Sequence, residues 1–409
     1  MRGRGLIMDR FSFCLPTRFE FGEGVEREAG RLTARAGGTK VLVLFGGGSV
    51  RRSGLLARVL DSLDRALLDH VEMGGVRPNP LSDLVYEGID LVRDEKVDFI
   101  IALGGGSVID TAKAIAAGAL YDGDFWDFYG GDLEPDRALP VGCVPTIAAS
   151  GSEASPDSVI TQAGSMLKRE TSSEVLLPVF ALLDPALTET LPPHQTAAGV
   201  TDMYSHLLER YLTNTREVEV TDRLIEGLML AILEEAPKVM ADPADYDARA
   251  NLQWAACMAH NGLAGVGRTE DWASHEIEYA LSSAYGVAHG AGLAVVMPAV
   301  MTYGLSHGPA RLAQLARRVW GVAVADDRAA ALEGIARMRA FTRSLGMPQT
   351  LEDVGGAAGD IERLAHETCF AGGRTGTVGG YIPFDEDDVR AIFGLMLRSS
   401  VDARPAQAA

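Results

Sequence analysis

The first half of the sequence alternates between short apolar runs and longer stretches whose apolar residues recur at helical spacing. The apolar runs are VLVLF (41–45), FIIAL (99–103), VGCVPT (141–146) and FALLD (180–184). Helical patterns occupy residues 55–70 and 81–95, and turn residues such as VRPNP (76–80) come before the second of them. Strands that alternate with helices form parallel βαβ units. The sequence therefore predicts an α/β N-terminal domain in which helices cover both faces of a parallel sheet.

The pattern changes after LDPALTETLPP (183–193), because long helical patterns then continue from residue 195 to the C-terminus with almost no strand candidates. A chain of 409 residues also exceeds the size at which one hydrophobic core stops growing. We therefore expect two domains, an α/β domain over residues 1–190 and an all-helical domain over residues 191–409.

Charge, hydropathy and cysteine spacing exclude several classes of protein. The formal charge of −19 opposes nucleic-acid binding, which normally requires a basic face. No apolar run approaches the roughly 20 residues that span a bilayer, and residues 1–9 lack the apolar region of a signal peptide. The four cysteines are far apart without a CxxC pair, which argues against disulfides or a zinc knuckle. We expect a cytoplasmic protein without nucleic-acid or membrane partners. Met8 looks more like a start than Met1, and we assign residues 1–7 no function.

Two glycine-rich loops follow apolar runs. Gly104, Gly105, Gly106 and Ser107 separate FIIAL from the helical pattern VIDTAKAIAAG, and Gly46, Gly47, Gly48 and Ser49 follow VLVLF. A strand, a glycine turn and a helix start present backbone N–H groups to an anion such as a pyrophosphate. Neither loop has GxGxxG spacing, so each alone is equally compatible with an ordinary tight turn. Two such loops in one sheet favour a nucleotide site.

One aspartate and three histidines form a possible metal-binding set. Asp202 and His206 are four residues apart in the helical stretch AAGVTDMYSHLLERYL, so their side chains share a face about 6 Å apart. His275 lies in another helical pattern, and His289 follows fourteen residues later beside glycines that suit a bend. A carboxylate with three imidazoles suits Zn(II) or Fe(II). Spacing alone leaves the alternative open that these are an exposed pair and two core histidines.

Several motifs together resemble the iron-containing alcohol dehydrogenases. They are GGGSVIDTAKAIA (104–116), GSE (151–153), LDPALTETLP (183–192), AAGVTDMYSHLLE (197–209) and the interval between the two later histidines. The similarity runs from about Met8 to FDEDDVRAIFGLML, and the most similar branch is that of the butanol dehydrogenase-like, NADPH-preferring aldehyde reductases. The resemblance implies a dinucleotide-binding first domain, a metal-binding and catalytic second domain, and a homodimer.

The resemblance also implies roles for individual residues. The metal, Fe²⁺ or Zn²⁺, is expected to be bound by Asp202, His206, His275 and His289. The expected cofactor contacts are Gly47, Gly48, Ser49, Gly105, Gly106, Ser107, Asp110, Thr146, Ser150 and Lys168. The candidate catalytic residues are Tyr279, Asp110 and Ser155.

Three of these positions depart from the family pattern. Ser150 stands where a threonine is usual, Ser155 where asparagine is frequent, and Tyr279 where a histidine is usual. Because Tyr279 follows His275 by four residues on a helix, we expect it to line the cleft near the metal. The alternative is a packed aromatic side chain.

The glycine loop after VLVLF bears on the choice of cofactor. NAD-selective relatives place an aspartate where this chain has Gly47, and a carboxylate there would repel a 2′-phosphate. Gly48 and Ser49 offer donors, and Arg51 and Arg52 add positive charge nearby unless they are merely solvated. We therefore expect a preference for NADP(H) over NAD(H).

These features favour a metal-dependent oxidoreductase that transfers a hydride between NAD(P)H and a small aldehyde or primary alcohol. One alternative is a metal- and NAD-dependent lyase or cyclase similar to dehydroquinate synthase, against which the aspartate and the extra histidine argue. The other is a non-catalytic binding relative, against which the full set of four metal-binding candidates argues.

Overall fold

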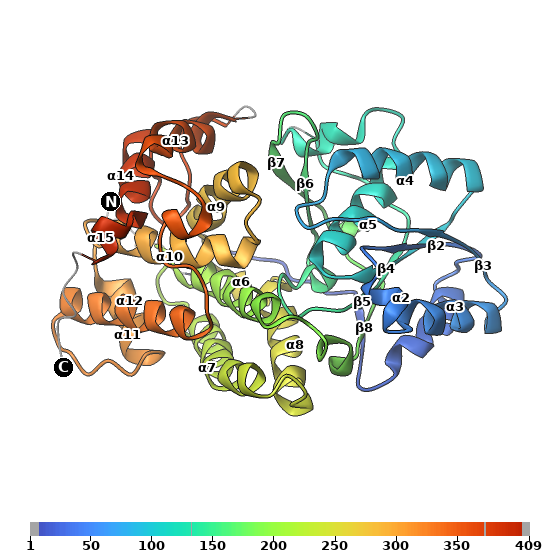
Figure 1. The fold of residues 1–409 in the computed structure, drawn as a ribbon, viewed down its shortest axis with the longest axis horizontal. Helices are drawn as coiled ribbons and strands as arrows, with labels where there is room; N and C mark the ends of the chain where they lie inside the picture. The colour runs from blue at the N-terminus through green and yellow to red at the C-terminus, as the bar shows by residue number, and fades with distance from the viewer. Residues whose placement is uncertain (1–7, 132, 372–373, 403–409) are drawn as a thin grey trace. The chain divides into compact units, whose positions relative to one another are not determined.

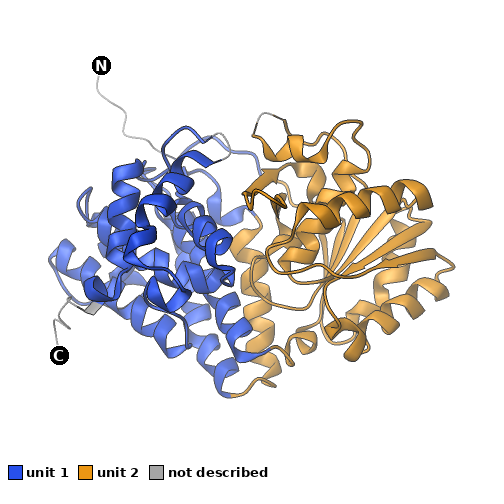
Figure 2. Cartoon of the chain, turned by 45° about the horizontal axis from the view of Figure 1, so that its top comes forward, with its two compact units in different colours: residues 1–13, 192–241, 262–409 blue, residues 14–191, 242–261 orange. Residues whose placement is uncertain are grey.

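The computed structural model describes residues 8–131, 133–371 and 374–402. The chain forms two compact units (Figure 2). The sheet unit comprises residues 14–191 and 242–261, and the helical unit comprises the described residues of 1–13, 192–241 and 262–409. Residues 1–7, to which the sequence assigns no function, lie outside the described part.

The chain passes from the sheet unit to the helical unit after residue 191, next to the expected boundary at residue 190. Two segments, however, do not follow a single division there. Residues 8–13 group with the helical unit, and helix α8 (Tyr246–His260) groups with the sheet unit. In α8, His260 Nε2 lies 2.7 Å from Asp157 Oδ2 and the Cys257 thiol donates to Glu153 Oε1 at 2.9 Å. Helical periodicity predicts that a segment is a helix but not which core it joins.

The sheet unit is built on six parallel strands in the order β1-β8-β5-β4-β2-β3. They are β1 (Arg18–Phe21), β2 (Lys40–Phe45), β3 (Asp69–Met73), β4 (Phe99–Gly104), β5 (Val141–Pro145) and β8 (Phe180–Leu183). The four predicted strands are confirmed as β2, β4, β5 and β8. The edge strands β1 and β3 escaped the sequence analysis because they are partly exposed and carry polar residues.

Helices cover both faces of this sheet (Figure 1). Along β2, Leu42 and Leu44 pack against α4 (Ser82–Glu95) and α5 (Gly106–Gly118). Val41 and Val43 point the other way, toward α1 (Ala29–Arg35) and α3 (Leu55–Arg65). The predicted helix over residues 55–70 was too long, because Leu67 has a φ of 58° and β3 begins at Asp69. A four-residue helix α2 (Ser49–Arg52) and the antiparallel pair β6 (Asp157–Thr161) and β7 (Lys168–Ser172) complete the unit.

The helical unit agrees with the expected helical second half. Its helices are α6 (Pro193–Tyr211), α7 (Glu219–Ala241), α9 (Ala273–Tyr285), α10 (His289–Gly304), α11 (Ala310–Arg318), α12 (Asp327–Ser344), α13 (Ile361–Phe370), α14 (Glu386–Met396) and α15 (Arg398–Asp402). α6 is buried from Thr196 to Tyr211 and packs against α7 and α10. The polar residues of α6 therefore lie in the interior of the protein.

Two further observations bear on the expected class of protein. All four cysteines are free thiols. Within the described ranges, none of the helices combines the length and the apolar character needed to cross a membrane.

Candidate metal centre and nucleotide-binding loops

The two glycine-rich loops follow neighbouring strands at the point where the order of the sheet reverses. β2 and β4 pair side by side, but the chain leaves β2 for β3 on one side and leaves β4 for β5 on the other. In open α/β sheets, ligands bind at the carboxyl ends of the strands at such a switch point. Residues 46–49 and 104–107 therefore flank the position where a dinucleotide is expected.

The loop after β4 packs tightly against the loop after β5. A Cβ at Gly105 would lie 2.5 Å from Ile147 Cγ2, and one at Gly106 would lie 2.3 Å from Ser150 Oγ. Thr146 N–H donates to Gly104 O at 3.2 Å. These glycines are required by close approach, and they bring the expected contacts of the loop after β4 together with Thr146 and Ser150 at the start of α5. Ser107 lies in the first turn of that helix, where N–H groups are available to a phosphate.

A buried lysine that the sequence analysis did not single out holds the loop after β5 in place. Lys113 Nζ donates to the carbonyl oxygens of Ser152, Ser155 and Asp157 at 2.7–2.8 Å. The sequence feature that could have identified Lys113 is its position three residues after Asp110 in a helical pattern, which places the two side chains on one face of the helix. The contacts fix a loop that contains Ser155, whose side chain is 1% exposed and accepts from Asp157 N at 3.3 Å.

Asp110 on α5 also binds the loop after β5. Its Oδ1 accepts from Ser152 Oγ at 2.6 Å and its Oδ2 accepts from Val159 N at 3.2 Å. Burial raises the pKa of Asp110 to about 6, although the charge of Lys113 opposes the change. One carboxylate oxygen thus supports the loop next to the glycine turn and the other binds the strand β6 that follows it.

The loop after β2 leaves space beside Gly47. A Cβ there would have no atom within 4 Å, whereas one at Gly48 would lie 2.6 Å from Arg52 Nη1. Arg51 forms an ion pair with Glu72 at 2.8 Å. Of the two arginines, Arg52 is thus the one that lies against the glycine loop.

Lys168 comes from a different part of the sheet unit. It lies on β7, is 8% exposed, and its Nζ donates to Asn79 Oδ1 at 3.1 Å. Asn79 has a φ of 52° and belongs to the turn before α4.

In the helical unit, the four candidate metal ligands converge from three helices. Asp202 and His206 lie on α6, His275 on α9, and His289 is the first residue of α10. From Asp202 Oδ1, the distances are 3.8 Å to His206 Nδ1, 4.0 Å to His275 Nε2 and 3.8 Å to His289 Nε2. Potential ligand atoms of Asp202, His275 and His289 all lie within 4.8 Å of one another. The rings of His206 and His275 are 4.7 Å apart.

The chemistry of these residues fits a divalent cation. Asp202 Oδ1 and His275 Nε2 are buried and make no hydrogen bond to any described residue. Separations near 4 Å are too long for hydrogen bonds but suit two ligands that each lie about 2.0–2.2 Å from one metal. Burial opposes ionisation of His275, yet the charges of Glu209 and Asp202 raise its pKa. The site therefore attracts positive charge.

Two buried glutamates that the sequence analysis missed hold the outer ring nitrogens. Glu209 Oε2 contacts His275 Nδ1, and Glu278 Oε2 contacts His289 Nδ1. Both carboxylates are fully buried. Each glutamate follows a histidine by three residues on its own helix, which was a usable signal. However, each contacts a histidine on a different helix, and spacing cannot reveal that pairing.

Of the glycines beside His289, Gly286 serves the expected bend, since it ends α9 with a φ of 65°. Gly290 and Gly292 instead allow close packing. His289 begins a continuous helix. A Cβ at Gly290 would lie 1.9 Å from Ala198 O on α6, and one at Gly292 would lie 2.5 Å from Glu278 Oε1. These two glycines let α10 approach α6 and make room for the carboxylate.

Two aromatic side chains adjoin the histidines. Tyr279 is 9% exposed, and its ring lies 5.9 Å from that of His289. Trp272 lies edge-on to His275 at 5.2 Å and to His206 at 6.0 Å, and Arg210 stacks on it at 4.5 Å.

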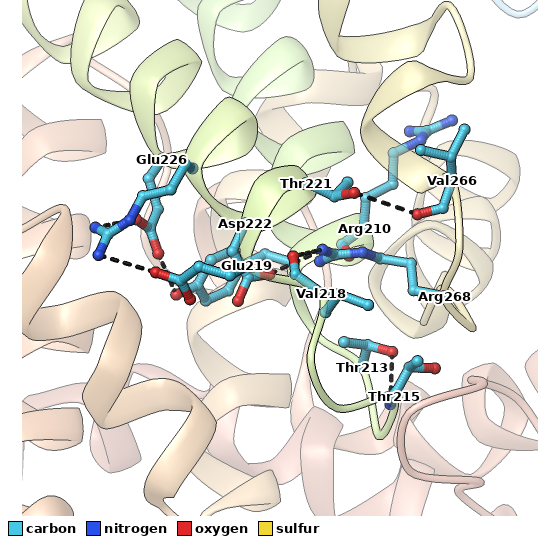
Figure 3. A network of polar contacts seen from close by, with 12 residues as sticks. Arg210, Thr213, Thr215, Val218, Glu219, Thr221, Asp222, Glu226, Val266 and Arg268 are labelled. Atoms are coloured by element: carbon cyan, nitrogen blue, oxygen red, sulfur yellow. Dashed lines mark hydrogen bonds and ion pairs between the residues drawn. The ribbon is translucent and has the colours of Figure 1, made fainter. Parts of the chain in front are cut away.

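A polar network fixes the segment that leads into α9 (Figure 3). Arg268 donates to Arg210 O and Val218 O, both at 3.1 Å, and pairs with Asp222 at 2.8 Å. Thr221 Oγ1 donates to Val266 O at 3.3 Å. This network ties residues 266–268 to the end of α6 and the start of α7, just before the helix that carries His275.

Comparisons with known proteins agree with this architecture. The family model described as "Iron-containing alcohol dehydrogenase" matches residues 16–185, and "Fe-containing alcohol dehydrogenase family, C-terminal" matches residues 196–397. The chain is 39% identical to a probable NADH-dependent butanol dehydrogenase 1 of Bacillus subtilis, over 94% of this chain and 99% of that protein. It is 40% identical to the NADPH-dependent aldehyde reductase YqhD of Escherichia coli, over 85% and 90% of the two chains.

A solved structure shows the same fold. The crystal structure of NADH-dependent butanol dehydrogenase A from Thermotoga maritima matches with a TM-score of 0.93 and 37% identity, covering 96% of this chain and 100% of the other. These matches favour an oxidoreductase over the lyase and the non-catalytic alternatives. The chain belongs to the iron-containing alcohol dehydrogenase family.

Proposed function

We propose that the chain reduces small aldehydes, and oxidises the corresponding primary alcohols, with NADP(H) preferred over NAD(H) and a divalent cation held by Asp202, His206, His275 and His289. The observation that carries the proposal is that buried Asp202 Oδ1 and His275 Nε2 face each other at 4.0 Å without hydrogen-bond partners among the described residues. Fe²⁺ and Zn²⁺ both suit an oxygen and nitrogen donor set. Relatives named as butanol dehydrogenases and as an aldehyde reductase support the substrate class.

The bound groups supply Lewis-acid polarisation of the substrate oxygen and a hydride donor or acceptor. The residues of the chain position the cofactor. Gly105, Gly106 and Ser107 offer N–H groups to the cofactor pyrophosphate, and Thr146 and Ser150 flank it. Lys168 reaches the phosphate or ribose side of the cofactor. The interactions of Asp110 and Ser155 preserve the shape of this loop.

The preference for NADP(H) rests on the loop after β2. Gly47 has open space where an aspartate would oppose a 2′-phosphate, and Arg52 lies against Gly48. Gly48 and Ser49 add donors to the same loop. The relatives include NADH-dependent and NADPH-dependent enzymes, so the argument depends on these residues of the chain itself.

Tyr279 is proposed to position a proton-relay water or the substrate oxygen. Its ring lies beside that of His289, and a tyrosine hydroxyl can donate and accept at neutral pH. A histidine at this position would change charge near neutral pH, whereas a tyrosine supplies a hydroxyl donor and acceptor instead.

The test of the proposed function removes and restores the metal. The protein is stripped with a chelator, verified as metal-free by elemental analysis, and assayed with linear, branched and hydroxylated aldehydes and both reduced cofactors. Activity should disappear and return with Zn(II), Fe(II) or Mn(II). His206→Ala should lose metal, whereas His194→Ala, an exposed histidine on the same helix, should keep it. Full turnover by verified metal-free protein would refute the proposal.

A homodimer is also proposed. β1 is an edge strand, and Phe21 on β1 and Trp254 on α8 are each 43% exposed and lie edge-on to each other at 6.3 Å. Exposed strand edges and aromatic clusters favour association with another chain. Light scattering after gel filtration should give twice the chain mass for the wild type and a smaller mass for Phe21→Arg.

A further inference from the structure

We propose that Glu209 and Glu278 are positioning residues that set the affinity and coordination geometry of the metal centre. The inference rests on the proposed metal site and concerns two residues that are not themselves ligands. Both side chains are fully buried and are aimed at the outer nitrogens of His275 and His289.

The partner of each ring determines which of its nitrogens carries the proton. A carboxylate can only accept, so each Nδ1 carries the proton and donates it to the glutamate. The neutral ring then keeps its lone pair on Nε2. The two Nε2 atoms are the ones that face Asp202, at 4.0 and 3.8 Å. The glutamates thus select the tautomer that a metal requires and fix the orientation of each ring.

Each carboxylate is held through both of its oxygens. Glu209 uses both oxygens, since Oε1 accepts from the backbone N–H of Ser274 and Oε2 accepts from His275. Glu278 also uses both, since Oε1 accepts from Ser282 Oγ and Oε2 accepts from His289. A glutamine offers only one acceptor oxygen, so one donor would then face an NH₂ group.

The two glutamates should therefore respond unequally to the same substitution. The Ser274 N–H cannot change direction, so Glu209→Gln either leaves two donors facing each other or forces His275 to carry its proton on Nε2, the nitrogen that faces the metal. The Ser282 hydroxyl can rotate to accept from the glutamine NH₂, and its hydrogen can turn toward Val287 O at 3.4 Å. We expect the larger loss of metal affinity in Glu209→Gln.

Gly292 provides an independent approach to the second pair. A Cβ at this position would lie 2.5 Å from Glu278 Oε1 and 2.8 Å from its Cγ. Gly292→Ala should displace the carboxylate from His289 while every ligand and both glutamates remain. Gly304→Ala on the same helix is the matched control, because its Cβ meets only Ile382 Cδ1 at 3.3 Å.

The experiment measures the dissociation constant for Co(II), by competition with a chelator, and the visible absorption spectrum of the Co(II) protein. Loss of an outer-shell partner typically weakens metal binding about 10–100-fold. We expect losses in that range for Glu209→Gln, Glu278→Gln and Gly292→Ala, with a changed spectrum. Glu276→Gln is the control on α9, since its Oε2 accepts from the backbone N–H of Gly379 rather than from a histidine ring. Melting of the metal-free proteins separates these effects from a general loss of folding.

The outcomes distinguish this inference from the proposed function. If the two glutamine variants and Gly292→Ala match Glu276→Gln in affinity and spectrum, the positioning role is refuted. Asp202→Asn provides the second comparison. If only Asp202→Asn binds the metal weakly, the proposed metal site stands and the positioning role of the two glutamates is refuted. If Asp202→Asn binds the metal as tightly as the wild type does, the metal site and the positioning role are both refuted.

Discussion

Gly290→Ala should detach His289 from the proposed metal site without altering any of the four proposed ligands. Gly290 is the second residue of α10, immediately after His289. A Cβ there would lie 1.9 Å from the carbonyl oxygen of Ala198, one helical turn before Asp202 on α6. Because the obstruction is backbone, no side-chain rotation can relieve it, and the two helices must separate.

The required separation can be worked out from these distances. Real Cβ contacts are essentially never shorter than 3.0 Å, so the backbones must move apart by about 1.1 Å, an overpacking strain that typically costs about 1–3 kcal/mol. Applied along the line from His289 Nε2 to Asp202 Oδ1, the shift stretches 3.8 Å to about 4.9 Å, whereas two ligands about 2.0–2.2 Å from one metal lie at most about 4.4 Å apart. His289 can then no longer share a metal with Asp202.

The assay compares metal binding under chelator competition with the melting temperature of the metal-free protein. Gly290→Ala should weaken metal binding at least about 100-fold, the upper end of the loss for an outer-shell contact, because a direct ligand is lost. Gly227→Ala on α7 is the matched control, since its Cβ would have no atom within 4 Å, and it should stabilise the helix by up to about 1 kcal/mol. Metal affinity in Gly290→Ala equal to that of the control would show that the contact between α6 and α10 does not set the geometry of the site.

Three further predictions concern the cofactor, the reaction and pH. Gly47→Asp should lower the ratio of kcat/KM for NADPH over NADH at least about 10-fold, because a carboxylate opposes the 2′-phosphate, and an unchanged ratio contradicts the cofactor assignment. Tyr279→Phe should lower kcat about 2- to 10-fold, as expected for one hydrogen bond, at unchanged melting temperature, and unchanged kinetics across pH would leave the hydroxyl without a role. Burial raises the pKa of Asp110 to about 6, so the folded state holds this proton more tightly than the unfolded chain, and the contribution of Asp110 to stability should rise as pH falls through 6 toward the ordinary value of 3.8. The contribution of Asp110 should therefore raise the melting temperature at pH 5 relative to pH 7.5 in Asp90→Asn, a control at an exposed position. This contribution should be absent in Asp110→Asn.

The sequence predicted those parts of the fold that follow from local patterns. Buried strands such as β2 and β4 are apolar on both faces, so they stand out as short continuous runs. β1 and β3 lie at the edges of the sheet, where partial exposure permits polar residues, and the pattern weakens there. The placement of α8 with the sheet unit depends on side chains such as His260 and Cys257 meeting partners about 100 residues away, which no local pattern records.

The candidate metal site shows the same division between local and tertiary information. The spacing of Asp202 and His206 on one helix can be read directly, but their convergence with His289 depends on how closely α10 approaches α6, and that approach is set by the missing side chain of Gly290. Likewise, Glu209 could be placed on the face of α6 that carries the ligands, yet its partner is His275 on α9. A ligand set therefore leaves a periodic signal in the sequence, whereas the groups that hold the ligands in place are selected by contacts between helices. Substitutions at the glycines and glutamates of such a site should therefore weaken metal binding strongly, although no periodic pattern in the sequence reveals the contacts that these positions make.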